Sequence, residues 1–123
     1  RVMFDMIGDV EETADIAASA PTMVIYVGGG TPKNFIQQTE VTNMVLGRDA
    51  EGHRYAIQFV VDAPHWGGLS GCTFEEAISW GKIAVDAKRV TVVSDAAIAL
   101  PIVAASVLTR RARKKRMRVP KLF

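Results

Sequence analysis

The stretch Met23-Val24-Ile25-Tyr26-Val27-Gly28-Gly29-Gly30-Thr31-Pro32 decides how this chain folds. It starts with a short, continuous apolar run rich in β-branched side chains, which is typical of a strand covered on both faces in a parallel sheet. The glycines permit a tight turn, Thr31 is a good N-cap, and Pro32 suits the first helical position. The stretch therefore predicts a strand, a glycine turn and a helix.

The neighbouring segments continue this alternation. Residues from about 2 to 19 repeat apolar positions at helical spacing and predict one or two amphipathic helices around Gly8. The helix after the glycine turn should run to about Leu46, with Gly47 as its C-cap. Tyr55 to Val61 and Arg89 to Val93 are two further, mostly apolar strands. Because strand, helix and strand follow one another, we expect right-handed parallel crossovers and an α/β fold.

Length and composition indicate one compact unit. The chain has 123 residues, and 49% of them are apolar, which is enough for a real core. It begins at Arg1 without an initiator methionine or a secretory leader, so we expect a piece of a longer protein. A single cysteine, Cys72, fits a reducing, cytoplasmic location. No apolar run reaches the roughly 20 residues that cross a bilayer, so no membrane association is expected.

Basic residues are concentrated at the C-terminal end. Eight of the fifteen basic residues lie within residues 110–123, and the rest of the chain has seven basic and thirteen acidic residues, a net charge of −6. We therefore divide the chain into a body, 1–109, and a basic tail, 110–123. Such a tail attracts polyanions or is simply solvated, and the acidic body argues against a nucleic-acid-binding domain.

The stretch Glu75-Glu76-Ala77-Ile78-Ser79-Trp80-Gly81-Lys82 collects the groups best suited to chemistry. Lys82 precedes the apolar residues 83–85, and burial of its amine would favour the neutral form that attacks a carbonyl to give an imine. Glu76 would oppose that effect by holding the ammonium charged. The alternative is a helix that ends at Gly81, with a solvated lysine beside its last carbonyls.

Glu76 has two interpretations. Thr73 to Glu76 form a capping box, which gives Glu76 a structural role at the start of a short helix. Glu76 and Trp80 are four positions apart, so their side chains share one helix face and could line a binding site.

Ligands bind in open α/β sheets beyond the carboxyl ends of strands, and several residues follow predicted strand ends. The turn at Gly28–Gly30 leads into a helix N-terminus and could face a phosphate or carboxylate, although a simple tight turn explains it equally. Ser94 and Asp95 follow the last strand. Asp95 is either the N-cap of a helix from Ala96 to about Arg116 or a partner for a hydroxyl or an amine.

The irregular stretch 62–71 forms a candidate binding loop. It contains His65, which is a possible base or ligand contact, although an isolated loop histidine is often structural. The spacing of His53, His65 and Cys72 matches no zinc motif, so we assign no metal.

Several blocks of sequence together resemble the C-terminal part of deoxyhypusine synthase, from Phe4 to about Leu108. These blocks are Gly28-Gly29-Gly30-Thr31-Pro32-Lys33, Ser70-Gly71, Glu76-Ala77-Ile78-Ser79-Trp80-Gly81-Lys82-Ile83, Val85-Asp86-Ala87 and Ser94-Asp95-Ala96. Their order and spacing match that family, and the block from Ser79 to Ile83 is the most specific.

The resemblance implies a Rossmann-like, doubly wound, mostly parallel sheet and a homotetramer that uses NAD, with active sites between subunits. In that family a hydride passes from spermidine to NAD, and an enzyme lysine captures the four-carbon fragment as an imine while 1,3-diaminopropane leaves. An acceptor amine then takes the fragment, and NADH reduces the new imine. The acceptor is a lysine of translation initiation factor 5A, or putrescine in the related homospermidine synthases.

By position, the resemblance also implies roles for individual residues. Lys82 would form the imine, and Glu76 and Trp80 would line the polyamine site. The residues expected at NAD are Gly28, Gly29, Gly30, Ser94 and Asp95.

The chain departs from the family pattern in three places. Asn34 replaces a substrate-contacting histidine, and Leu69 replaces a substrate-binding carboxylate. The N-terminal two thirds of the family, which supply much of the NAD site, have no counterpart here. The two substitutions resemble the bacterial deoxyhypusine-synthase-like branch.

We therefore expect an NAD-dependent aminobutyl transferase, inactive as this piece alone, with donor and acceptor open. The alternatives are a homospermidine synthase and a non-catalytic fragment or assembly subunit.

Overall fold

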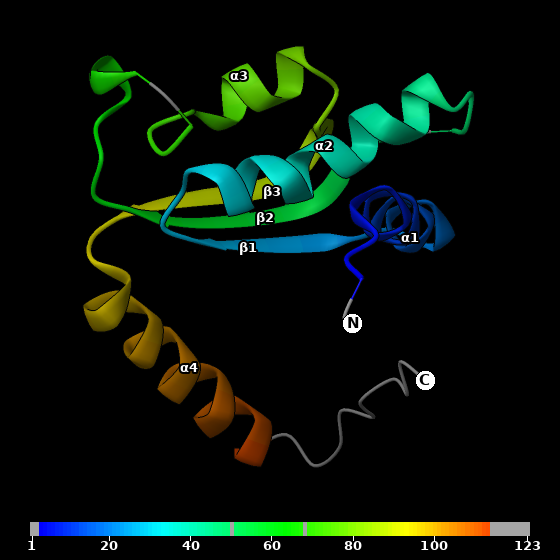
Figure 1. The fold of residues 1–123 in the computed structure, drawn as a ribbon. Helices are drawn as coiled ribbons and strands as arrows, with labels where there is room; N and C mark the ends of the chain where they lie inside the picture. Colours follow the sequence, from blue (N-terminus) through cyan, green and yellow to red (C-terminus); the bar gives the residue numbers. More distant parts are fainter. Residues whose placement is uncertain (1–2, 50, 68, 114–123) are drawn as a thin grey trace.

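The computed structural model describes residues 3–49, 51–67 and 69–113 (Figure 1). Helices and strands alternate along the chain. Their bounds are α1 Met6–Ser19, β1 Met23–Val27, α2 Thr31–Val45, β2 His53–Val60, the 3-10 helix η1 Pro64–Trp66, α3 Phe74–Ser79, β3 Ile83–Val93 and α4 Ala96–Arg113. This alternation confirms the predicted α/β class.

The described strands form one parallel sheet in the order β1-β2-β3. Ile25 of β1 lies opposite Ile57 of β2, which lies opposite Val90 of β3. β1 has its predicted bounds, β2 begins slightly before the predicted Tyr55, and β3 begins six residues before the predicted Arg89. A parallel sheet that alternates with helices is a fragment of a Rossmann-like fold.

Helices lie on both sides of the sheet, with α2 and α3 on one side and α4 on the other (Figure 1). The hydrophobic core fills the space under α2 and α3. Its members are Val24, Tyr26, Ala56, Phe74, Ala77, Ile83, Ala84 and Ala87. α1 packs against α2, where Asn43 donates a hydrogen bond of 2.9 Å from Nδ2 to the carbonyl oxygen of Ala14.

The opposite face of β1 is open in the described part of the chain. Met23, Ile25 and Val27 alternate with the buried Val24 and Tyr26, and each of the three is more than half exposed. The expectation that β1 is covered on both faces is therefore wrong for this chain. The residues of β1 are apolar enough for both faces of the strand to be covered, but α4 extends away from this part of the sheet (Figure 1).

The helix ends differ from the predictions by small amounts. α1 is one helix that begins at Met6, because the Asp5 side chain accepts a hydrogen bond from the amide of Gly8. Gly30, with a φ of 77°, is the N-cap of α2 in place of Thr31, and Leu46 is its C-cap in place of Gly47.

α4 continues through the predicted boundary at residue 109 to Arg113, and the remainder of the basic tail, 114–123, lies outside the described residues. No helix in the described ranges combines the length and the apolar character needed to cross a membrane.

Candidate functional site

A layer of polar side chains lies between α2 and the sheet. α2 buries polar residues along its inner face, whereas Phe35 and Ile36 on its outer face are partly exposed. The buried residues of α2 are Lys33, Gln37, Thr39, Glu40 and Asn43. A helix that turns its polar face to the protein interior marks a place where buried polar groups need partners, and such groups are often functional.

Lys33 occupies the end of this layer nearest the glycine turn. Its side chain is 4% exposed, and Nζ donates hydrogen bonds to the carbonyl oxygen of Cys72 at 2.8 Å and to Oε1 of Gln58 at 3.2 Å. Nζ also lies 5.6 Å from the centre of the Tyr26 ring. Burial lowers the pKa of the Lys33 amine.

Lys82 follows α3 and directly precedes β3, and it is partly exposed. Its Nζ lies 5.8 Å from the centre of the Trp80 ring, close enough for a cation–π interaction. The backbone of Lys82 is fixed on both sides: its amide donates to the carbonyl of Ala77 at 3.0 Å, and its carbonyl accepts from the amide of His53 at 3.2 Å. The deeply buried amine of the site is therefore Lys33, and Lys82 is the more accessible one.

Glu76 lies in the first turn of α3, and its carboxylate is exposed. Its amide donates to the hydroxyl of Thr73 at 3.2 Å, which confirms the predicted N-cap of this helix. The pKa of Lys33 is lowered chiefly by burial, while the charge of Glu76 raises it and the charge of Lys82 lowers it. The structure thus brings Lys33, Glu76 and Lys82 into one electrostatic cluster, even though the backbone of Lys82 lies at the amino end of β3.

The glycine turn forms the carboxyl edge of the site. Gly28 and Gly30 have φ values of 79° and 77°, and a Cβ at Gly28 would meet nothing within 4 Å. A Cβ at Gly29 would lie 2.4 Å from Cα of Ser70, so Gly29 is required by the adjacent loop. Asn34 is partly buried, and its amide donates to the carbonyl of Gly30 at 3.1 Å.

Ser94 and Asp95 lie at the same edge. The amide of Ser94 donates to the carbonyl of Val60, and the amide of Gly28 donates to that of the adjacent Phe59, so both segments are anchored to the end of β2. Oδ1 of Asp95 accepts from the amide of Ala97 at 2.7 Å, which confirms Asp95 as an N-cap.

This edge offers the kinds of group that a dinucleotide needs. Beside the open glycine turn is an apolar recess of about 330 Å³, lined by Val27, Ala96, Ala97, Leu100, Pro101 and Ala104. A glycine turn allows close approach of phosphates, an apolar recess accepts a flat ring, and an exposed carboxylate such as Asp95 accepts hydroxyl groups. The residues at this edge are therefore compatible with part of an NAD site.

The loop between β2 and α3 bounds a second hollow. His65 and Trp66 are exposed on this loop, with their ring centres 4.8 Å apart. Between the loop and β3 lies a pocket of about 500 Å³ whose lining includes Gln58, Cys72 and Arg89. In the described residues, no group of three or more His, Cys, Asp or Glu side chains is arranged to hold a metal ion.

Comparison with known proteins identifies the family. The family model for deoxyhypusine synthase matches residues 1–107. The chain belongs to the deoxyhypusine synthase family. The sequence is 62% identical over 105 residues to the "Probable deoxyhypusine synthase 2" of Methanosarcina mazei, which covers 85% of this chain and 30% of that protein.

Two other relatives place this match in context. The "Probable deoxyhypusine synthase 2" of Archaeoglobus fulgidus is 57% identical over 115 residues, 93% of this chain and 39% of that protein. The "Deoxyhypusine synthase-like protein" of Nostoc sp. is 43% identical over 118 residues, 89% of this chain and 31% of that protein. The chain thus spans about a third of the length of these relatives, and it is more similar to the two archaeal proteins than to the cyanobacterial protein.

The sequence analysis did not predict that Lys33 and His53 are buried in this region, and it did not name Lys33 as a site residue. Both belong to polar positions that a helical or strand pattern assigns to solvent. The signal for Lys33 is the spacing of Lys33, Gln37 and Glu40 at i, i+4 and i+7, which places three polar side chains on one face of α2.

Proposed function

We propose that this chain contributes the lysine-bearing part of an active site that transfers an aminobutyl group from spermidine, or a related polyamine, to an amine acceptor. The observation that carries this proposal is the position of the Lys82 amine over the Trp80 ring, with the carboxylate of Glu76 in the same electrostatic cluster. An amine nucleophile, an aromatic face and a carboxylate are together suited to a cationic amine substrate.

Lys82 is the proposed nucleophile. Its neutral amine attacks the carbon that has lost a hydride, the bond to the departing 1,3-diaminopropane breaks, and the four-carbon fragment remains as an imine on Nζ. Lys82 is partly exposed, so we propose that the remainder of the active site covers it and excludes water from the reacting amine.

The other residues have binding roles. Trp80 offers an indole face, and Glu76 a carboxylate, to the ammonium groups of the polyamine. Asn34 offers hydrogen bonds without a titrating group. NAD, when bound, supplies the hydride acceptor, and the residues proposed to hold it are Gly28, Gly29, Gly30, Ser94 and Asp95.

Assembly is part of this proposal. Because the chain spans about a third of its relatives and leaves one face of β1 open, we propose that the complete site forms in a homo-oligomer, expected to be a tetramer, with the remaining portion of the protein present. The acceptor is either a protein lysine or a small amine such as putrescine.

The test is reductive trapping. A chain extended to the length of its relatives is incubated with NAD and spermidine, treated with borohydride, digested and mapped by mass spectrometry. We expect an aminobutyl adduct on Lys82, its loss in Lys82→Ala, and its retention in Lys88→Ala, a matched exposed lysine. A missing adduct, or normal turnover by Lys82→Ala, would refute the proposed mechanism. Supplying putrescine or an acceptor protein then distinguishes the two kinds of acceptor by product mass.

One observation favours a second candidate, a non-catalytic assembly subunit. The described residues provide only one edge of a dinucleotide site, and Lys82 is partly exposed. Calorimetry with NAD on the extended chain, combined with trapping, separates the two cases: an extended chain that binds NAD but forms no adduct would support the assembly role.

A further inference from the structure

A buried polar network that the proposed chemistry does not use lies at the amino end of the sheet. His53, the first residue of β2, is 2% exposed, and Glu40 of α2 is 3% exposed. Nδ1 of His53 lies 2.6 Å from the hydroxyl of Thr22 and 3.3 Å from Oε1 of Glu40. Nε2 lies 3.4 Å from the carbonyl oxygen of Ile36. Thr22, Glu40 and His53 thus join β1, α2 and β2.

The partners of the imidazole restrict where its protons lie. The carbonyl of Ile36 only accepts, so Nε2 must carry a proton to make this contact favourable. Nδ1 faces a hydroxyl and a carboxyl group, each of which can donate when it is protonated. Burial lowers the pKa of His53 and raises the pKa of Glu40, so both groups are shifted toward the neutral state.

This network is connected to the backbone of Lys82. Glu40 and Gly52 line the same pocket, and the amide of His53, the next residue, donates to the carbonyl of Lys82 at 3.2 Å. A Cβ at Gly52 would lie 2.6 Å from the backbone nitrogen of Ala84, so this segment packs directly against the start of β3.

The sheet ladder does not fix this region by itself. His53 pairs with Ile83, but the next pair joins Tyr55 to Lys88, so the register shifts between them. The pair formed by His53 and Ile83 is therefore separated from the regular ladder of Tyr55 to Val60. The side-chain contacts of His53 add to the backbone hydrogen bonds that the amides of Arg54 and Tyr55 donate to the carbonyl of Thr22.

We propose that His53 and Glu40 are positioning residues for Lys82. They hold the segment Gly52–His53, this segment holds the carbonyl of Lys82, and the amine is thereby kept beside Trp80. The inference rests on the proposed function only in taking Lys82 as the reactive lysine. The network touches neither the polyamine nor the cofactor, and it acts through the backbone.

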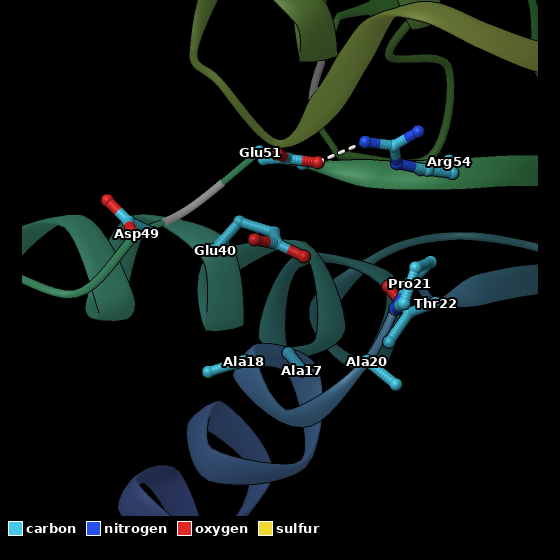
Figure 2. A pocket seen from close by; sticks show the side chains of 10 residues that line it. Ala17, Ala18, Ala20, Pro21, Thr22, Glu40, Asp49, Glu51 and Arg54 are labelled. Atoms are coloured by element: carbon cyan, nitrogen blue, oxygen red, sulfur yellow. Dashed lines mark hydrogen bonds and ion pairs between the residues drawn. The ribbon is translucent and has the colours of Figure 1, made fainter.

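The network is also open to changes in pH through a neighbouring hollow. A pocket of about 220 Å³ lies between the end of α1, α2 and the start of β2, and Glu40 lines it together with Asp49, Glu51 and Arg54 (Figure 2). Glu51 and Arg54 form an ion pair across this pocket, as Figure 2 shows. Asp49, Glu51 and Arg54 are the charged groups that line this pocket together with Glu40.

The experiment uses nuclear magnetic resonance on the 123-residue chain. The carbonyl carbon of Lys82, the amide of Ile83 and the Hε protons of Lys82 are followed between about pH 4 and 8, a range that brackets the ordinary pKa values of Glu and His. We expect the Lys82 carbonyl and Ile83 amide to shift with the titration of the His53 and Glu40 pair. We also expect the ring-current shift of Hε, caused by Trp80, to change in parallel.

The variants H53Q and E40Q should abolish this shared inflection and move the Hε protons toward their random-coil position, while E51Q, on the outer side of the pocket, should retain both. The inference would be overturned if the Lys82 signals of the unmodified chain do not shift with pH and are the same in folded H53Q. If H53Q does not fold, the titration of the unmodified chain decides the question alone, because a flat Lys82 carbonyl profile overturns the inference by itself. None of these signals requires imine formation, so a failed borohydride experiment would refute the proposed function and leave the positioning role intact.

Discussion

The amine of Lys33 donates a hydrogen bond of 2.8 Å to the carbonyl oxygen of Cys72, which ties the first turn of α2 to the loop that precedes α3. The same amine also reaches Oε1 of Gln58 in the sheet. One buried cation therefore connects a helix, a strand and the loop that leads to the proposed catalytic lysine.

Replacing Lys33 with methionine should make stability less dependent on alkaline pH. Burial lowers the pKa of Lys33 from its ordinary value of 10.5. At pH values between the lowered pKa of the folded chain and the ordinary pKa of 10.5, the unfolded chain binds more protons at this amine than the folded chain does. The free energy of unfolding therefore rises with pH over this range. Urea unfolding at a series of alkaline pH values should show a smaller rise in Lys33→Met than in the unmodified chain.

The exposed Lys88 provides the control for this experiment, since Lys88→Met leaves the buried amine in place. Lys33→Met should also lower stability by about 1–3 kcal/mol, because the acceptors on Gln58 and Cys72 lose their donor. Equal alkaline slopes in the two variants would contradict the assignment of the effect to Lys33.

Asn43→Ala should loosen α1 from the rest of the molecule. The Asn43 amide group donates to the carbonyl of the fully buried Ala14 at 2.9 Å and accepts from Arg48 at 3.1 Å. Loss of the buried donor should lower the free energy of unfolding by about 1–3 kcal/mol, with faster amide hydrogen exchange in α1. Arg48→Ala removes an exposed ion pair with Asp15 and the hydrogen bond to Asn43, but it leaves the contact between Asn43 and Ala14 in place, so it should cost less than Asn43→Ala. A larger effect of Arg48→Ala than of Asn43→Ala would show that the contacts of Arg48, and not the hydrogen bond from Asn43 to Ala14, hold α1.

The sequence predicted the strand β1, the glycine turn, the caps at Thr73 and Asp95, and the parallel α/β class, because each depends on local chemistry or strong periodicity. It did not predict that β3 begins at Ile83. Residues 84–87 face no regular ladder partner, since the register shifts between the pairs of His53 and Tyr55, and they therefore lack the pattern of a paired strand.

The polar layer was also beyond sequence reasoning. Periodicity assigns polar residues of a helix to solvent, whereas α2 turns Lys33, Gln37 and Glu40 toward the sheet. Their partners Gln58 and His53 come from β2, far away in the sequence, so only the folded structure brings them together. The same limit applies to Lys82, whose charge acts on Lys33 although the two residues are 49 positions apart in the sequence.

Gly29→Ala should disturb the loop at Ser70, whereas Gly28→Ala should not. A Cβ at Gly29 would lie 2.4 Å from Cα of Ser70, so the loop must move, at a cost of about 1–3 kcal/mol. A Cβ at Gly28 meets nothing within 4 Å, but the φ of 79° should cost about 1–2 kcal/mol. Amide chemical shifts around Ser70 measure the difference. Similar shifts at Ser70 in both variants would exclude the close contact as the reason for Gly29.

Ile25→Lys should weaken self-association of the chain more than it lowers the stability of the monomer. Ile25 is 51% exposed on the open face of β1, between Met23 and Val27, so about half of the residue is free to contact another copy. If this face is covered in the oligomer, loss of half an isoleucine side chain should cost about 1 kcal/mol per copy, roughly a fivefold weaker dissociation constant. Sedimentation equilibrium measures the association, and urea unfolding measures the monomer. Ile16→Lys, a matched change on the exposed side of α1, serves as the control, since Ile16 is 60% exposed. If Ile25→Lys associates as tightly as the unmodified chain while Ile16→Lys does not, then α1 forms the contact and the open face of β1 stays free in the oligomer.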